Sequence, residues 1–169
     1  HVEVNYHSWD IGTCIQEIAE NSVDTPHLKF LHGAPMIPPV EFEADGPISK
    51  YNIMDGYIWG IGHGPGISET RHNKGDVAML MFALSTPVHA ELTRTRMAFT
   101  WKKYPEGSED AKTAEHLYNH SIGEAEGEDS AGFESVDLIV WDNKKYRPNP
   151  LLCDGDGPIL RFREYFKQF

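Results

Sequence analysis

The sequence has few cysteines, no long apolar run and little positive charge, and each shortage excludes a class of protein. Cys14 and Cys153 are too few, in 169 residues, for a disulfide framework or a cysteine-based cluster, so a cytoplasmic location is expected. No apolar stretch reaches the roughly 18 residues that a membrane helix needs, and no signal peptide is visible. The net charge of −11 argues against a nucleic-acid ligand, because phosphates repel an acidic surface.

The remaining composition is that of one ordinary domain, with 40% hydrophobic and 24% charged residues. Hydrophobic periodicity predicts strands or hairpins over residues 51–61, 77–82 and 88–101, the last two being antiparallel neighbours with a turn at 85–87. It predicts helices over residues 14–22, 26–32, 109–120, 131–145 and 159–169, the first two separated by a break at 23–26. Irregular structure or loops are expected over residues 33–50, 60–66 and 124–130. This order of strands and helices indicates an α+β fold.

One short segment, Asp24-Thr-Pro-His27-Leu-Lys-Phe-Leu-His32, is the strongest candidate for a chemical site. Two histidines and a carboxylate can hold a first-row transition metal and leave coordination positions open for chemistry. The histidines are five residues apart, which is about 140° around an ideal helix. They could still converge on one ion if the helix ends or loosens at residues 31–33. The alternative is that they are ordinary core or surface histidines.

A second candidate is Asp137, which lies on an apolar face of the helix expected over residues 131–145, among Phe133, Val136, Val140 and Trp141. A carboxylate in such a place costs several kcal/mol unless it is paired or metal-bound. One candidate partner is a lysine or an arginine, the arginine candidates being Arg94, Arg96 and Arg147. The other is a metal held by His27 and His32, with which Asp137 would complete a facial triad of two histidines and one carboxylate.

These two segments together resemble the Rieske-type non-haem iron oxygenases. Asn21-x-x-Asp24-x-x-His27-x-x-x-x-His32 resembles their mononuclear-iron segment. The C-terminal part is similar to the end of the oxygenase component of 3-ketosteroid 9α-hydroxylases and to cholesterol 7-desaturases. The similarity lies in Gly132-Phe-x-x-x-Asp137-x-x-x-Trp141-x-Asn-Lys, Asn149-Pro-Leu-Leu, Asp156-Gly-Pro-Ile and Phe162-Arg-x-x-x-x-Gln168-Phe169.

The resemblance implies a role for five residues. His27, His32 and Asp137 match the ligands of the Fe(II) ion. Asp24 matches the carboxylate that connects the iron site of one subunit to the Rieske cluster of its neighbour, and it would hydrogen-bond a ligand histidine. Asn21 matches an asparagine near the iron that shapes the pocket. The implied fold is a helix-grip (START-like) domain, in which a curved antiparallel sheet packs on a long C-terminal helix around an apolar cavity.

The chain departs from this family in one respect, because it lacks the Cys-x-His and Cys-x-x-His pairs that hold a Rieske [2Fe–2S] cluster. We therefore expect residues 1–169 to be a single catalytic domain, with the N-terminal Rieske domain absent from this chain. The cluster would come from a missing domain or a partner. A start at His1 without methionine favours a fragment or a processed product, and the alternatives are a separate electron donor or loss of the redox step.

The function expected from the resemblance is O₂-dependent hydroxylation or desaturation of an apolar, steroid-like or aromatic substrate. The electrons would come from a Rieske and ferredoxin-reductase donor, without which the chain would be inactive, and the assembly would be a homotrimer. Candidate pocket residues lie on the central strands, although an ordinary core is the simpler interpretation: Met79, Met81, Met97, Phe99 and Trp101. The alternative function is a helix-grip module that binds a lipid or sterol without catalysis.

Overall fold

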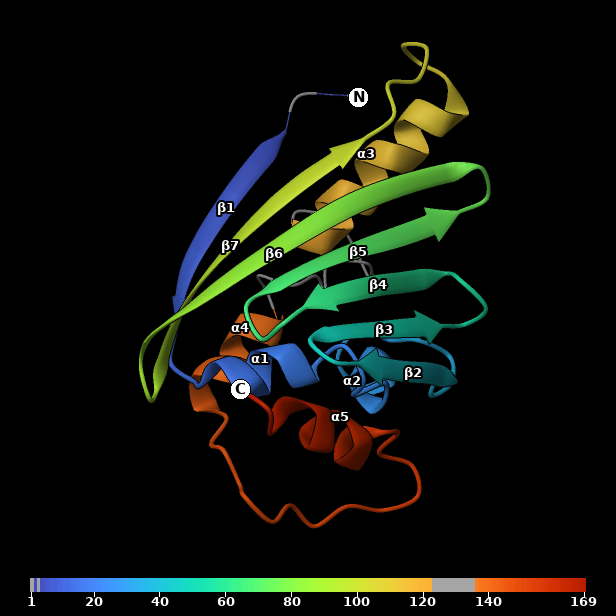
Figure 1. Cartoon of the computed structure of the whole chain (residues 1–169). Helices are drawn as coiled ribbons and strands as arrows, with labels where there is room; N and C mark the ends of the chain where they lie inside the picture. The colour runs from blue at the N-terminus through green and yellow to red at the C-terminus, as the bar shows by residue number, and fades with distance from the viewer. Residues whose placement is uncertain (1, 3, 123–135) are drawn as a thin grey trace.

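The computed structural model describes residue 2, residues 4–122 and residues 136–169, and it is built on one antiparallel sheet of seven strands (Figure 1). The strand order is β1-β7-β6-β5-β4-β3-β2, and every neighbouring pair is antiparallel. The strands are β1 (Asn5–Ile11), β2 (Val40–Asp45), β3 (Ile48–Ile53), β4 (Ile58–His63), β5 (Ile67–Lys74), β6 (Val77–His89) and β7 (Leu92–Trp101). Strands β2 to β7 therefore form a continuous meander, and the last of them pairs with the first strand of the chain.

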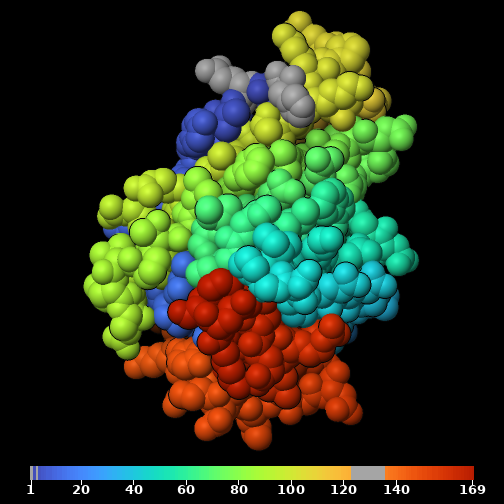
Figure 2. Space-filling view, in the orientation of Figure 1, coloured from blue at the N-terminus to red at the C-terminus, as the bar shows by residue number. Residues whose placement is uncertain are grey.

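In the part of the chain that the structure describes, five helices pack against this sheet: α1 (Ile15–Glu20), α2 (Pro26–Phe30), α3 (Glu109–Ile122), α4 (Leu138–Asn143) and α5 (Ile159–Phe166). Helices α1, α2, α4 and α5 gather at one end of the sheet, whereas α3 packs on β6 (Figure 1). In the space-filling view the red C-terminal segment lies directly against the cyan residues of the β2–β3 region (Figure 2). Helix α1 from the N-terminal part of the chain and helix α5 from the C-terminal part thus contact each other at this end of the sheet.

Buried side chains form three clusters that tie the helices to the sheet. One joins α5 to β2 and β3 through Phe42, Tyr51, Phe162 and Tyr165. A second joins α3 to β6 and β7 through Met79, Met97, Phe99 and Leu117, and a small third one contains Ile11, Ile18 and Trp141. The sheet face toward the helices is therefore largely apolar, as expected when an antiparallel sheet has one covered face.

Much of the predicted order of elements is confirmed. The structure has α1 and α2 separated by residues 21–25, strands β3 and β4 over most of the predicted range 51–61, an antiparallel β6–β7 pair, and α3 where a helix was expected over residues 109–120. Pro26 is at the first position of α2, where its missing N–H costs nothing. An α+β fold is thus correct, and the described residues contain no helix long and apolar enough to cross a membrane.

Three local predictions are wrong. Residues 33–50 are not wholly irregular, because β2 and the start of β3 lie there. Residues 60–63 belong to β4 rather than to a loop, because this strand pairs with β3 and β5 on either side. Gly60 is needed there, since a Cβ at this position would lie 2.6 Å from the main-chain oxygen of Glu69. Residues 85–87 are not a turn: β6 continues to His89, with an irregular register at Pro87 of the kind that admits proline within a strand.

The prediction of one long C-terminal helix is not confirmed. Within the described residues, α4 has 6 residues and α5 has 8, and the longest helix is α3 with 14. Part of the helix predicted over residues 131–145 and the acidic loop predicted over 124–130 lie outside the described residues. What the structure does show is a π-helical turn at 136–137 leading into α4, and this turn carries Asp137.

Candidate metal centre and its cavity

The candidate site is built on the bent segment formed by α1 and α2. Buried Ile18 packs α1 against Trp141 of α4, and the chain then turns through main-chain hydrogen bonds such as Asp24 N–H to Glu20 O, 3.2 Å. Helix α2 ends at Phe30, and Gly33 follows with a positive φ of 72°. His32 therefore lies beyond the helix that carries His27, so the two histidines are not held at the angle of a continuous helix.

His27, His32 and Asp137 converge in space. One possible ligand atom from each lies within 4.8 Å of the others. The Nε2 atom of His32 is 3.0 Å from Oδ2 of Asp137, and the two imidazole rings stand edge to face with centroids 5.3 Å apart. Two ligands at right angles, each about 2.1 Å from a metal, are themselves about 3 Å apart. The donor set and its spacing thus fit Fe(II), for which two histidines and one carboxylate are a characteristic set.

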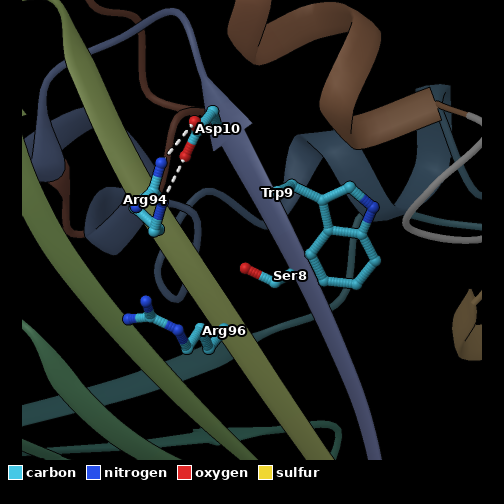
Figure 3. Close-up of a pocket in the computed structure, with 5 residues that line it drawn as sticks. All are labelled: Ser8, Trp9, Asp10, Arg94 and Arg96. Carbon is cyan, nitrogen blue, oxygen red and sulfur yellow. Dashed lines mark hydrogen bonds and ion pairs between the residues drawn. The ribbon is translucent and has the colours of Figure 1, made fainter.

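Asp137 is buried, with 4% of its surface exposed, and His32 is the partner that the structure gives it. Among the described residues, no arginine forms an ion pair with Asp137, so the predicted arginine partner is not found. Arg94 pairs with Asp10 on the opposite, outer face of the sheet, where the Nε–Oδ1 distance is 2.6 Å. Arg96 lies beside this pair in a shallow pocket formed with Ser8, while Trp9 points to the other side of β1 (Figure 3).

Hydrogen bonds set the orientation of His27. Its Nδ1 atom donates to the main-chain oxygen of Asp24, so the proton is on Nδ1 and Nε2 has its lone pair available for a ligand. The side-chain nitrogen of Asn21 lies 3.4 Å from this Nε2. Burial lowers the pKa of His27, although the negative charges of Asp137 and Asp24 oppose this effect. The imidazole is therefore held in its neutral, metal-binding form at neutral pH.

The contact between Asp24 and His27 differs from the expected one in a single respect. The acceptor is the main-chain carbonyl of Asp24, whereas a hydrogen bond to its carboxylate was expected. The reason is local, because His27 is three residues ahead in the first turn of α2 and its ring reaches back to the carbonyl. The carboxylate of Asp24 remains close enough to raise the pKa of His27.

A cavity of about 470 Å³ adjoins the three residues and has a mostly apolar wall. It lies between the inner face of the sheet and helices α1 to α5, and its volume is within the usual range for small-molecule sites. Of the predicted pocket residues, Met81 and Met97 line the cavity. Met79 and Phe99 are instead part of the core under α3, with Trp101 packed against it.

Sequence reasoning missed several cavity residues on other strands. Tyr51 on β3 and Thr70 on β5 form a buried hydrogen-bonded pair, and His72 also lines the cavity. The available signal was the polar alternation of Ser68, Thr70 and His72, which places all three on one face of a strand. What the alternation does not reveal is that this face meets the cavity beside His32.

An antiparallel sheet with two histidines and a carboxylate at the end of an apolar cavity is the arrangement expected of a mononuclear non-haem iron oxygenase domain. The family model described as the 3-ketosteroid 9alpha-hydroxylase C-terminal domain matches residues 1–169. The chain therefore belongs to this family and is a catalytic domain of the Rieske oxygenase type.

Individual relatives agree with this assignment. The chain is 27% identical over 195 residues to a cholesterol 7-desaturase of Caenorhabditis elegans, covering 92% of this chain and 42% of the relative. It is 47% identical over 38 residues to a probable 3-ketosteroid-9-alpha-monooxygenase oxygenase component of Rhodococcus rhodochrous, covering 22% of this chain and 9% of that protein. The chain thus spans less than half the length of these curated relatives.

Solved structures share the fold at low sequence identity. NdmA of Pseudomonas putida CBB5 superposes with a TM-score of 0.69 at 15% identity, over 98% of this chain and 49% of that one. Dicamba monooxygenase bound to dicamba superposes with a TM-score of 0.60 at 11% identity, over 98% of this chain and 57% of that one. These likenesses establish the fold of the domain.

Proposed function

We propose that this chain is the iron-binding catalytic domain of an oxygenase that hydroxylates or desaturates an apolar, steroid-like substrate. The observation that carries the proposal is the convergence of His27, His32 and Asp137 at the wall of a largely apolar cavity. Relatives named for 3-ketosteroid monooxygenation and cholesterol desaturation support the choice of substrate class. We further propose that residues 1–169 form a single domain that receives electrons from a Rieske cluster outside these residues.

Fe(II) held by His27, His32 and Asp137 would supply the activation of O₂ for attack on an unactivated C–H bond. In hydroxylation, R–H, O₂, two electrons and two protons give R–OH and water. In desaturation, two hydrogens are removed from neighbouring carbons and O₂ is reduced to two molecules of water, again with two external electrons and two protons. Both outcomes need an external electron donor.

The chain's own side chains supply positioning and exclude water. The main-chain oxygen of Asp24 fixes the His27 ring by accepting its Nδ1 proton, and the amide of Asn21 lies beside Nε2 of the same ring. Met81, Met97 and Trp141 give the cavity an apolar wall, which favours entry of an apolar molecule over water. A substrate in this cavity lies next to the three proposed ligands, because the same cavity is lined by all of them.

Asp24 has a second proposed role, as the acidic group through which electrons reach the site from the Rieske cluster of a neighbouring subunit. Its position in the turn before His27 supports this role, as does its electrostatic effect on that imidazole. A homotrimer, in which each subunit receives electrons from the next, would place a donor at every site. Asp24→Asn should therefore slow electron delivery from a Rieske donor and leave the binding of Fe(II) unchanged.

The test uses the iron-loaded chain with a saturated steroid ketone, and two ways of supplying electrons. In the first, a Rieske donor, its reductase and ¹⁸O₂ are added. In the second, hydrogen peroxide replaces them, because it already contains the two electrons that O₂ lacks. We expect product with one ¹⁸O atom, or product lighter by two hydrogens, and no product from His32→Ala. Tight steroid binding without turnover under either supply would favour the ligand-carrying alternative.

A further inference from the structure

The inner face of β5 is unusually polar for the wall of an apolar cavity. Ser68, Thr70 and His72 occupy alternate positions on this strand, and all three line the cavity. Thr70 is already engaged, because its hydroxyl is hydrogen-bonded to that of Tyr51. His72 lies two residues further along the strand, opposite Ile58 on β4 and Met79 on β6.

The imidazole of His72 makes no hydrogen bond to any residue that the structure describes, and it is half-buried in the wall of the cavity. Burial, with the nearby His120 and His32 acting in the same direction, lowers the pKa of His72 to about 4. At neutral pH the ring is therefore uncharged and offers one N–H donor and one nitrogen acceptor. A polar group in apolar surroundings is costly unless it has a partner, so the ring is suited to a ligand that brings one.

The surroundings restrict what that ligand can be. The cavity wall near His72 includes Ile58 and Met81, and among the polar residues of the wall Thr70 and Tyr51 bond to each other. A charged ligand group would find no opposite full charge on His72. A single carbonyl or hydroxyl oxygen on an otherwise apolar molecule would match the one donor and one acceptor of the ring.

We propose that His72 is the specificity-determining residue of the cavity and that it hydrogen-bonds a single oxygen substituent of an apolar ring substrate. This inference rests on the proposed function and deepens it. A fixed oxygen at His72 and a fixed metal centre at His27, His32 and Asp137 would together decide which carbon of the substrate faces the centre. His72 thus positions the substrate and takes no part in binding the metal.

The experiment measures binding of three probes to the full chain by quenching of tryptophan fluorescence, because Trp141 lines the cavity. The probes are 5α-androstan-3-one, 5α-androstan-17-one and the parent hydrocarbon 5α-androstane, delivered from cyclodextrin. The variants are His72→Phe and His72→Gln. His63→Phe is the matched control, since it makes the same change on the exposed end of the neighbouring strand β4. His72→Leu replaces the phenylalanine variant if circular dichroism shows that it does not fold.

We expect the unchanged protein to bind one of the two ketones about tenfold more tightly than the hydrocarbon, which corresponds to one buried hydrogen bond. His72→Phe should abolish this preference while keeping the affinity for the hydrocarbon, and His72→Gln should restore part of it. The inference is overturned if the unchanged protein shows no preference for a ketone, or if His72→Phe keeps that preference. It is also overturned if His72→Phe weakens the binding of all three probes, the hydrocarbon included, to the same low affinity.

Titration of the same proteins with Fe(II) separates this inference from the proposed function. Normal Fe(II) binding with no ketone preference would overturn the role of His72 alone. Failure of the unchanged protein to bind Fe(II) would overturn the proposed function instead.

Discussion

A buried ion pair between α1 and α5 gives a sharp test of how the site is supported. The guanidinium of Arg163 bonds both carboxylate oxygens of Glu20, at 2.8 and 2.9 Å, and lies 3.6 Å from Glu17. The exposed fractions of these three side chains are 10%, 5% and 2%. Burial disfavours the charged guanidinium, but Glu20 and Glu17 outweigh this effect and raise the pKa of Arg163.

Arg163→Met removes the guanidinium and leaves the buried carboxylate of Glu20 without its ion pair, whereas Glu17 keeps its pair with Lys144 at 2.9 Å. Breaking a buried pair from one side typically costs about 3–5 kcal/mol in the free energy of unfolding. For a protein of this size each kcal/mol lowers the melting temperature by about 2–4 °C, so we expect a fall of roughly 6–20 °C. The assay is thermal unfolding followed by circular dichroism at neutral pH.

The matched control is Lys167→Met on the same helix. Lys167 pairs with Glu164 at 2.5 Å, but both side chains are about 70% exposed, so its loss should cost no more than about 1 kcal/mol. The double variant Arg163→Met, Glu20→Leu should regain part of the lost stability, because an apolar pair can replace a buried ion pair. Equal melting temperatures for Arg163→Met and Lys167→Met would refute the reasoning.

Two further predictions concern the sheet. Gly60→Ala should destabilise the protein by about 1–3 kcal/mol in urea unfolding, since its Cβ would lie 2.6 Å from the main-chain oxygen of Glu69. The control is Gly155→Ala, whose Cβ would meet only the sulfur of Cys153 at 3.8 Å and which should be nearly neutral. Because the pKa of His72 falls from 6.5 in the unfolded chain to about 4 in the fold, the unfolded state binds more protons between these values. Stability should therefore be lost as pH falls from 6.5 toward 4, and between pH 7 and 5 the unchanged protein should lose about 2 kcal/mol more than His72→Phe; equal pH dependence would contradict this.

The sequence allowed prediction of features that depend on local chemistry. Pro26 marks the start of α2, and the two histidines were expected to converge if the helix ended or loosened at residues 31–33; it ends at Phe30. The buried position of Asp137 followed from its apolar neighbours, and the structure places it against His32. The start of α2 depends on residues close together in the sequence, and a buried carboxylate such as Asp137 needs a hydrogen-bonding or charged partner wherever that partner comes from.

Features that depend on distant strands could not be predicted in this way. Strand β6 continues through Pro87 because β7 still pairs with it there, whereas its pairing with β5 ends at Leu84 and leaves the other side of Pro87 without a ladder partner that its missing N–H would serve. Met81 and Met79 have the same chemistry and the same face of β6, yet only Met81 lines the cavity while Met79 is covered by the α3 cluster. His72 was missed for the same reason, because its importance comes from the helices that close the cavity over β5.

Anaerobic measurement of Fe(II) bound per chain tests the central claim most directly. We expect the unchanged protein to bind one Fe(II) per chain, and His32→Ala and Asp137→Ala, checked for folding by circular dichroism, to lose most of this affinity. His63→Ala, which changes an exposed histidine away from the cluster, should bind Fe(II) as the unchanged protein does. No Fe(II) uptake by the folded, unchanged protein, or equal uptake by all four proteins, would contradict a metal centre at His27, His32 and Asp137.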